Sequence, residues 1–244
     1  MRPFLFLGTR AEDEAADSEY AAVLACTGLD ERELRRVRLE SEELGSVDLD
    51  DWSGIMLGGG PFNVSDPAEV KAPVQQRVEA ELAALAEAVV DADFPFLGAC
   101  YGIGVLGRLR GGLVDRTYGE PIGCVEVTLT GDGRSDPLFT GMPTSFDVFL
   151  GHKEAVRRLP AGAVLLASST TCPVQAFRLG HHVYATQFHP ELDAEGLCLR
   201  IDTYRQHGYF PPAQARSLRD MARRSVVTEP PRLLSSFVER YARP

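Results

Sequence analysis

The sequence predicts an α/β protein with a central, mostly parallel sheet flanked by helices and a smaller antiparallel or mixed portion. Up to about residue 99, short apolar runs that suit buried strands alternate with helical patterns. After Gly112, short β-type runs follow one another without a helical pattern between them. The chain has 244 residues, 44% of them hydrophobic, which is enough to bury one large core.

The first half of the chain supplies the parallel strands. Strands are expected at 4–7, 34–39, 55–57 and 95–99. An alanine-rich helix is expected at 11–26, with Gly28 as its stop signal. The clearest helix covers 70–89, where Val70, Val74, Val78, Leu82, Leu85 and Val89 recur at helical spacing. Pro73 is compatible with the first turn of that helix.

The second half of the sequence predicts a series of strands followed by helices. The expected strands cover 122–130, 146–150, 164–167, 174–179 and 183–188. Three helices are expected beyond Asp193, around 197–204, 218–221 and 233–241, and Pro-Pro precedes the last two. We therefore expect a core over residues 1–192 and a helical C-terminal extension over 193–244, packed together as one globular unit.

Composition argues against several kinds of partner. The net charge of −10 disfavours a nucleic-acid backbone or an anionic membrane surface. The five cysteines form no Cys-x-x-Cys pair and no obvious disulfide framework. The apolar run near the N-terminus is too short for a signal peptide or a membrane span. These features predict a reduced, cytoplasmic protein.

The stretch 94–104 has the form of a strand, a sharp turn and a helix, with Cys100 at the turn. Gly98-Ala99-Cys100-Tyr101-Gly102 matches the pattern of a nucleophile elbow with Cys in place of Ser. Small residues let the backbone fold tightly, and the N-terminus of a helix stabilises a thiolate. A buried structural cysteine and a glycine-rich dinucleotide loop are the alternatives.

A nucleophilic cysteine needs a base, and five histidines are available. His207 falls in an expected helix among polar residues, and His181-His182 in an expected hairpin turn, so both suit the surface. No Cys or carboxylate stands near that pair at ligand spacing, which argues against a metal there. His152 ends an apolar strand and is a candidate for a pocket wall.

His189 is the best candidate for the base. It lies in Gln187-Phe188-His189-Pro190-Glu191, at the end of an expected strand. Pro190 ends the strand ladder and fixes the backbone. A carboxylate two residues away in extended chain shares the histidine's face, so Glu191 is placed to hold the imidazole in one tautomer.

Taken in order, these motifs resemble the class I, or triad, glutamine amidotransferases. The closest resemblance is to the amidotransferase domain of GMP synthase and its stand-alone relatives. The matching motifs are Gly59-Gly60-Pro61, Gly98-Ala99-Cys100-Tyr101-Gly102 and Gln187-Phe188-His189-Pro190-Glu191, with Gly151-His152-Lys153-Glu154 and Pro173-Val174-Gln175-Ala176-Phe177 in support. Each motif alone is weak, but the ordered set is specific, and it covers roughly residues 45–192.

The resemblance implies a flavodoxin-like fold and a glutaminase half-reaction that needs no cofactor or metal. Cys100 would attack the side-chain amide of glutamine, His189 would act as base and then acid, and Glu191 would orient His189. Backbone N–H groups of Gly60 and Tyr101 would hold the oxyanion, as a glycine loop and the residue after a nucleophile can.

Contacts to the substrate follow from the same resemblance at Gly59, Gly104, Gly151 and His152. The family usually has Gln four residues after the nucleophile, where this chain has Gly104. That difference leaves open whether glutamine or another γ-glutamyl compound is the substrate.

Other functions stay open at this point. Nothing after Glu191 resembles a synthetase, so ammonia would go to a separate synthetase partner or be released. A stand-alone γ-glutamyl hydrolase or peptidase would use the same residues, and a catalytically silent regulatory protein could share the fold. Gly102-x-Gly104-x-x-Gly107 has the form of a dinucleotide fingerprint, but residues 115–121 look turn-like where that motif needs a strand ending in an acidic residue.

Overall fold

The computed structural model describes residues 2–244, and Met1, with which the expected core begins, lies outside the described residues. Within these residues, nine strands form one sheet in the order β2-β1-β3-β4-β11-β10-β9-β6-β7. The strands of the parallel half are β1 (Phe4–Gly8), β2 (Leu34–Arg38), β3 (Gly54–Leu57), β4 (Phe96–Ala99) and β11 (Val183–Thr186). The antiparallel half contains β6 (Glu120–Leu129), β7 (Ser145–His152), β9 (Val164–Ser168) and β10 (Ala176–Leu179). The mixed α/β sheet expected from the sequence is confirmed.

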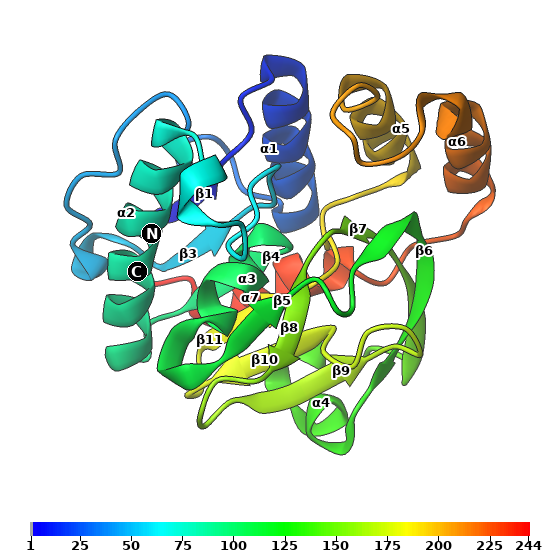
Figure 1. The fold of residues 1–244 in the computed structure, drawn as a ribbon. Coiled ribbons are helices and arrows are strands. Elements are labelled where there is room, and N and C mark those ends of the chain that lie inside the picture. The colour runs from blue at the N-terminus through cyan, green and yellow to red at the C-terminus, as the bar shows by residue number, and fades with distance from the viewer. Residues whose placement is uncertain (1) are drawn as a thin grey trace.

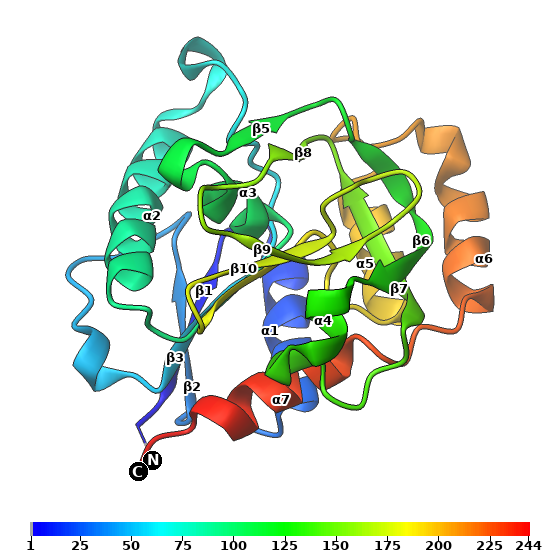
Figure 2. The ribbon, with the colours of Figure 1, turned by 90° about the horizontal axis from the view of Figure 1, so that it is seen from below.

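Helices cover both faces of the parallel half (Figures 1 and 2). The helices are α1 (Asp13–Thr27), α2 (Pro73–Asp91), α3 (Tyr101–Gly107), α4 (Gly131–Ser135), α5 (Ala194–Thr203), α6 (Ala215–Arg224) and α7 (Pro231–Tyr241). Along β1, Leu5 and Leu7 enter the core cluster that contains α2 and α3, whereas Phe4 and Phe6 enter the cluster that contains α1 and α7. Both faces of β1 are therefore buried, which explains its continuous apolar sequence.

The C-terminal helices reach two parts of the molecule. Helices α5 and α6 lie side by side near β6 and β7 (Figure 1) and share a third apolar cluster with Phe149 of β7. Helix α7 crosses back beneath the sheet, where Phe237 is fully buried and its ring packs against Phe4 of β1. The backbone N–H of Arg2 donates to the carbonyl of Arg243 at 3.0 Å, so the two ends of the described chain meet (Figure 2).

Several expected boundaries are wrong, each for a local reason. Helix α2 begins at Pro73 rather than at Val70, because the residue before a proline is held extended. Val70 lies in a short 3₁₀ turn and is 71% exposed. His207 lies in a turn after α5 rather than in a helix. The expected strand 183–188 ends at Thr186, so His189 follows the strand by three residues.

The sequence analysis also missed two strands. These are β5 (Leu113–Asp115) and β8 (Ala155–Arg158), which pair antiparallel with each other in a separate two-stranded sheet. They are too short for an alternating pattern to stand out. Gly28 ends α1 in the left-handed conformation, with φ of 71°, as expected from its place.

Candidate active site

The expected catalytic residues meet at the carboxyl edge of the parallel strands. Strands β3, β4 and β11 are neighbours in the sheet, and Thr186 pairs with Ala99. The residues just beyond these strands are Gly59-Gly60, Cys100 and His189. Since parallel strands end at the same edge, three segments far apart in sequence converge there.

Cys100 occupies a strained turn between β4 and α3. Its φ of 52° and ψ of −90° lie outside the regions that L residues prefer. Its N–H donates to the carbonyl of Thr186 at 2.8 Å, which ties the turn to β11. A Cβ on Gly98 would lie 2.9 Å from the carbonyl carbon of Gly102, so the turn closes only with glycine there. The geometry is that of a nucleophile elbow.

His189 and Glu191 form a buried pair at the same edge. His189 Nδ1 and Glu191 Oε1 are 2.8 Å apart, and both side chains are almost fully buried. A carboxylate only accepts, so the contact with Glu191 favours the tautomer with the proton on Nδ1, in which Nε2 is left to accept one. A Cβ on Gly59 would lie 2.2 Å from His189 Cε1, so Gly59 leaves the space that the imidazole occupies.

The charges around His189 act on its pKa in opposite directions. Burial lowers this pKa, the Glu191 carboxylate raises it, and the Arg200 guanidinium lowers it. Cys100 also raises it, and the net result is a pKa above the usual value. For Glu191, burial raises the pKa, but His189 and Arg200 outweigh burial and hold it far below its usual range. Glu191 is thus a fixed negative charge beside the His189 imidazole.

Arg200 is a part of the site that sequence reasoning missed. From α5, its Nη2 donates to Glu191 Oε1 at 2.7 Å, and its Nη1 lies 3.0 Å from His189 Nδ1. The same Nη2 lies 3.2 Å from Glu19 Oε1, a fully buried carboxylate of α1, and Arg10 Nε donates to that oxygen at 3.1 Å. Two guanidinium groups thus neutralise two buried carboxylates near His189.

The sequence does contain a signal for these charges. Glu19 lies four residues from both Ala15 and Val23 on the buried stripe of α1. Arg200 likewise follows Leu197 by three residues on the buried face of α5. A charged residue inside an apolar stripe needs a buried partner. The pattern alone does not say which partner, because the two helices are far apart in sequence.

Two cavities meet at Cys100. The Tyr101 cavity, about 380 Å³ including its open mouth, is lined by Tyr101, Gly104, His152, Lys153 and Gln187, among others. The His189 cavity, about 480 Å³ on the same basis, is lined by Arg10, His189 and Arg200 together with Ile122, Leu150, Leu192, Leu197 and Tyr204. Both are lined by Gly60, Cys100, Gly151 and Tyr209.

The expected oxyanion donors are close to the nucleophile. Gly60 lines both cavities beside Cys100. Thr9 Oγ1 donates to the carbonyl of Gly59 at 3.0 Å, which holds the glycine loop in place. Tyr101 is the first residue of α3, so its N–H has no acceptor within the helix. Both backbone groups stay candidates for an oxyanion hole.

Gly104 lies in the wall of the Tyr101 cavity, facing side chains that take up the room of a longer residue. A Cβ on Gly104 would lie 3.1 Å from Glu154 Oε1 and 3.2 Å from Val64 Cγ2. The Glu154 carboxylate accepts from the N–H groups of Val64 and Ser65, both at 2.8 Å. The space beside this glycine is therefore already filled by a carboxylate that two backbone donors hold in place.

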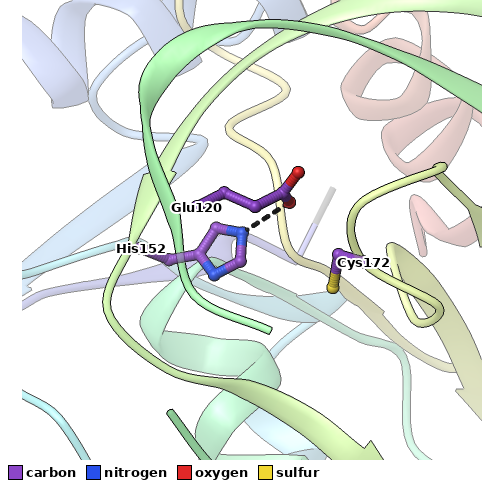
Figure 3. Close-up of side chains that lie close together, drawn as sticks. All are labelled: Glu120, His152 and Cys172. Atoms are coloured by element: carbon purple, nitrogen blue, oxygen red, sulfur yellow. Dashed lines mark hydrogen bonds and ion pairs between the residues drawn. The ribbon is translucent and has the colours of Figure 1, made fainter. Parts of the chain in front are cut away.

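His152 lines the Tyr101 cavity and lies beside Glu120 and Cys172 in a buried cluster (Figure 3). Its Nδ1 lies 2.9 Å from the carbonyl of Glu154 and its Nε2 lies 2.9 Å from Glu120 Oε2. Potential ligand atoms of Glu120, His152 and Cys172 lie within 4.8 Å of one another. Gln175 Nε2 also donates to Glu120, and burial raises the pKa of Cys172 to about 11. Because protein donors already use the carboxylate, we assign no metal to this cluster.

The dinucleotide hypothesis does not fit the observed backbone. Gly102, Gly104 and Gly107 all lie inside α3 rather than in a loop before a helix. A Cβ on Gly107 would lie 2.6 Å from Val156 Cγ2, so this glycine serves helix packing. Asp115 does end a strand, but that strand belongs to the separate two-stranded sheet. The glycine spacing therefore lacks the βαβ unit that the fingerprint requires.

Comparisons with known proteins identify the family of the chain. The sequence profile of class I glutamine amidotransferases matches residues 23–196, which is most of the chain. A crystal structure of a glutamine amidotransferase from Thermotoga maritima superposes with a TM-score of 0.77, covering 99% of this chain and 98% of that one at 23% identity. The chain belongs to the class I glutamine amidotransferases.

Within the family, similar proteins are glutamine-hydrolysing GMP synthases. One from Thermomicrobium roseum is 32% identical over 184 residues, which cover 72% of this chain and 30% of that protein. One subunit of the GMP synthase from Methanoculleus marisnigri is 34% identical over 140 residues, covering 57% of this chain and 65% of that polypeptide. The matches thus span less than two thirds of these relatives. Among residues 2–244, no helix combines the length and apolar character needed to cross a bilayer.

Proposed function

We propose that this chain hydrolyses the γ-amide of glutamine or of a related γ-glutamyl compound through a thioester on Cys100. The observation that carries the proposal is that the strained Cys100 elbow and His189, which is paired with the buried Glu191, line the same cavity. A nucleophile, a base and an orienting carboxylate are the parts that covalent acyl transfer requires.

In the proposed first step, the Cys100 sulfur attacks the γ-carbonyl carbon while His189 Nε2 takes the thiol proton. The N–H groups of Gly60 and Tyr101 would stabilise the oxyanion. His189 then gives its proton to the departing nitrogen, and the C–N bond breaks. Water hydrolyses the thioester with His189 again as base, releasing glutamate and restoring the thiol.

The γ-glutamyl part of the substrate would occupy the Tyr101 cavity. Gln187 Oε1 is buried at its wall and has no hydrogen-bond partner among residues 2–244. It suits an ammonium donor of the substrate. Lys153 is a cationic side chain in the lining of this cavity, and its Nζ lies 4.2 Å from the Tyr209 ring centroid. It suits the carboxylate of the substrate.

For glutamine as substrate, the released ammonia would be used by a separate synthetase partner. The relative from Methanoculleus marisnigri is itself one subunit of a GMP synthase, which supports this arrangement. A stand-alone γ-glutamyl hydrolase is the second candidate function, favoured by Gly104 and by the second cavity at Cys100. The intact trio of Cys100, His189 and Glu191 favours either enzyme over a silent regulatory protein. A cytoplasmic location stays a prediction.

The experiment is to measure glutamate and ammonia release from glutamine, and labelling by 6-diazo-5-oxo-L-norleucine, an alkylating mimic of glutamine. We expect turnover and one label on Cys100, both lost in Cys100→Ala. Cys124→Ala is the matched control, because Cys124 lies outside both cavities. Full activity in Cys100→Ala would refute the mechanism.

A further inference from the structure

Cys100 lies where two cavities meet, although glutamine hydrolysis needs room for a group larger than ammonia or water on only one side. The γ-glutamyl part of glutamine occupies one side of the scissile bond, and the leaving group is a single ammonia. Yet the His189 cavity, at about 480 Å³ with its open mouth included, is larger than the Tyr101 cavity, at about 380 Å³ on the same basis. The structure therefore has more space on one side than ammonia uses.

The position of the acid identifies the leaving-group side. The histidine of an acyl-transfer triad gives its proton to the departing amine, so that amine leaves from the histidine's side. His189 lines the second cavity, together with Cys100, whereas Tyr101 and Gln187 line the first. The His189 cavity is therefore the place of the leaving group.

The lining of the His189 cavity suits an apolar substituent. Four aliphatic side chains and two tyrosines make up half of its lining residues: Ile122, Leu150, Leu192, Leu197, Tyr204 and Tyr209. Its two guanidinium groups are already paired, Arg10 with Glu19 and Arg200 with Glu191. Arg10 also donates to the Tyr204 hydroxyl at 3.2 Å. The charges of Arg10 and Arg200 are thus neutralised by their carboxylate partners, and the rest of the cavity wall is mainly apolar.

We propose that the preferred substrate is a γ-glutamyl amide whose amine carries an apolar substituent, with that substituent in the His189 cavity. The proposal rests on the proposed function and narrows its substrate. Cys100 sulfur bonds to the γ-carbonyl carbon, the C–N bond breaks, and the amine leaves as R–NH₂ with the proton from His189. Water then releases glutamate, so the products are glutamate and a primary amine.

The test compares kcat/KM for glutamine and for its N-methyl, N-ethyl and N-isobutyl γ-amides by glutamate release. An apolar pocket discriminates by about tenfold or more for each well-packed methylene. We therefore expect the N-isobutyl amide to exceed glutamine by at least about tenfold. In Ile122→Trp, which fills the cavity, the ratio of the two values should fall towards one. Val226→Trp is the control, since Val226 is 75% exposed and the ratio should not change.

The outcomes separate this proposal from the one it rests on. If 6-diazo-5-oxo-L-norleucine labels Cys100 but no alkyl amide exceeds glutamine, the substrate proposal is wrong and the thioester mechanism stands. An unchanged ratio in Ile122→Trp would also overturn the assignment of the leaving group to this cavity. If no substrate releases glutamate and Cys100 is not labelled, both proposals fail.

Discussion

The carboxyl edge of the sheet and the C-terminal segment, residues 193–244, contribute to the same site in different ways. The edge presents Cys100 and His189 from the ends of neighbouring strands, where position follows from strand pairing. The C-terminal segment contributes Arg200 from α5 and Tyr209 from the loop after it. The place of a residue at a strand end follows from the order in which the strands pair. The place of a side chain on a distant helix depends instead on how that helix packs.

The two groups also differ in chemical role. Cys100 and His189 would exchange protons and bonds with the substrate, so their loss removes the reaction. Arg200 contacts Glu191 and His189, so in the proposed mechanism it would act through His189 rather than on the substrate. This difference predicts graded effects, which the following variants measure in order of expected size.

The largest effect is expected at the carboxyl end of β11. His189→Asn should lower kcat/KM by about 10³- to 10⁶-fold, because it removes the base and acid of both steps. His181→Asn is the matched control at the opposite end of the same strand, where the side chain is exposed in the hairpin. Equal losses in both variants would mean that His189 has no special role.

Glu191→Gln should have the next largest effect, a loss of about 10²- to 10⁴-fold in kcat. The Glu191 carboxylate raises the pKa of His189, so its loss lowers that pKa. Since the base must be neutral to act, the acid limb of the pH–rate profile should move to lower pH. A limb that moves to higher pH would contradict the assigned pairing.

Arg200→Met should have a smaller effect, a loss of about 10- to 100-fold in kcat, and the opposite shift in the pH profile. The Arg200 charge lowers the pKa of His189, so removing it raises that pKa and moves the acid limb to higher pH. Arg200→Lys keeps the positive charge, so the acid limb of its pH–rate profile should lie where it does in the unsubstituted protein. This variant tests the prediction even if Arg200→Met folds poorly. Arg223→Met is the control, because Arg223 forms an exposed ion pair with Glu195. A limb that does not move in Arg200→Met would refute the positioning role.

The smallest effect on catalysis, but a clear one on stability, is expected from α7. Phe237→Ala should lower the free energy of unfolding by about 3–5 kcal/mol, because it leaves a cavity beneath β1. Val226→Ser, at a residue that is 75% exposed, should change it by less than about 0.5 kcal/mol. Denaturant titration should show one transition if 193–244 unfolds together with the rest. Two separate transitions would contradict the prediction of one globular unit.

The sequence by itself determined the succession of strands and helices in the first half, the elbow at Cys100 and the pairing of His189 with Glu191. These features are local, since each depends on residues within a few positions of one another. Even so, α2 begins three residues later than its apolar spacing suggests, because Pro73 restricts the residue before it. Short-range sequence patterns therefore predicted which helices and strands form better than they predicted where each one begins and ends.

Only the tertiary structure decided what surrounds the catalytic residues. Glu19 and Arg200 lie 181 positions apart, and a lone charge in an apolar stripe does not identify its partner. The same holds for the two cavities, whose walls combine strand ends with residues of the C-terminal segment. Contacts of this kind depend on packing between distant elements, which no short-range pattern encodes.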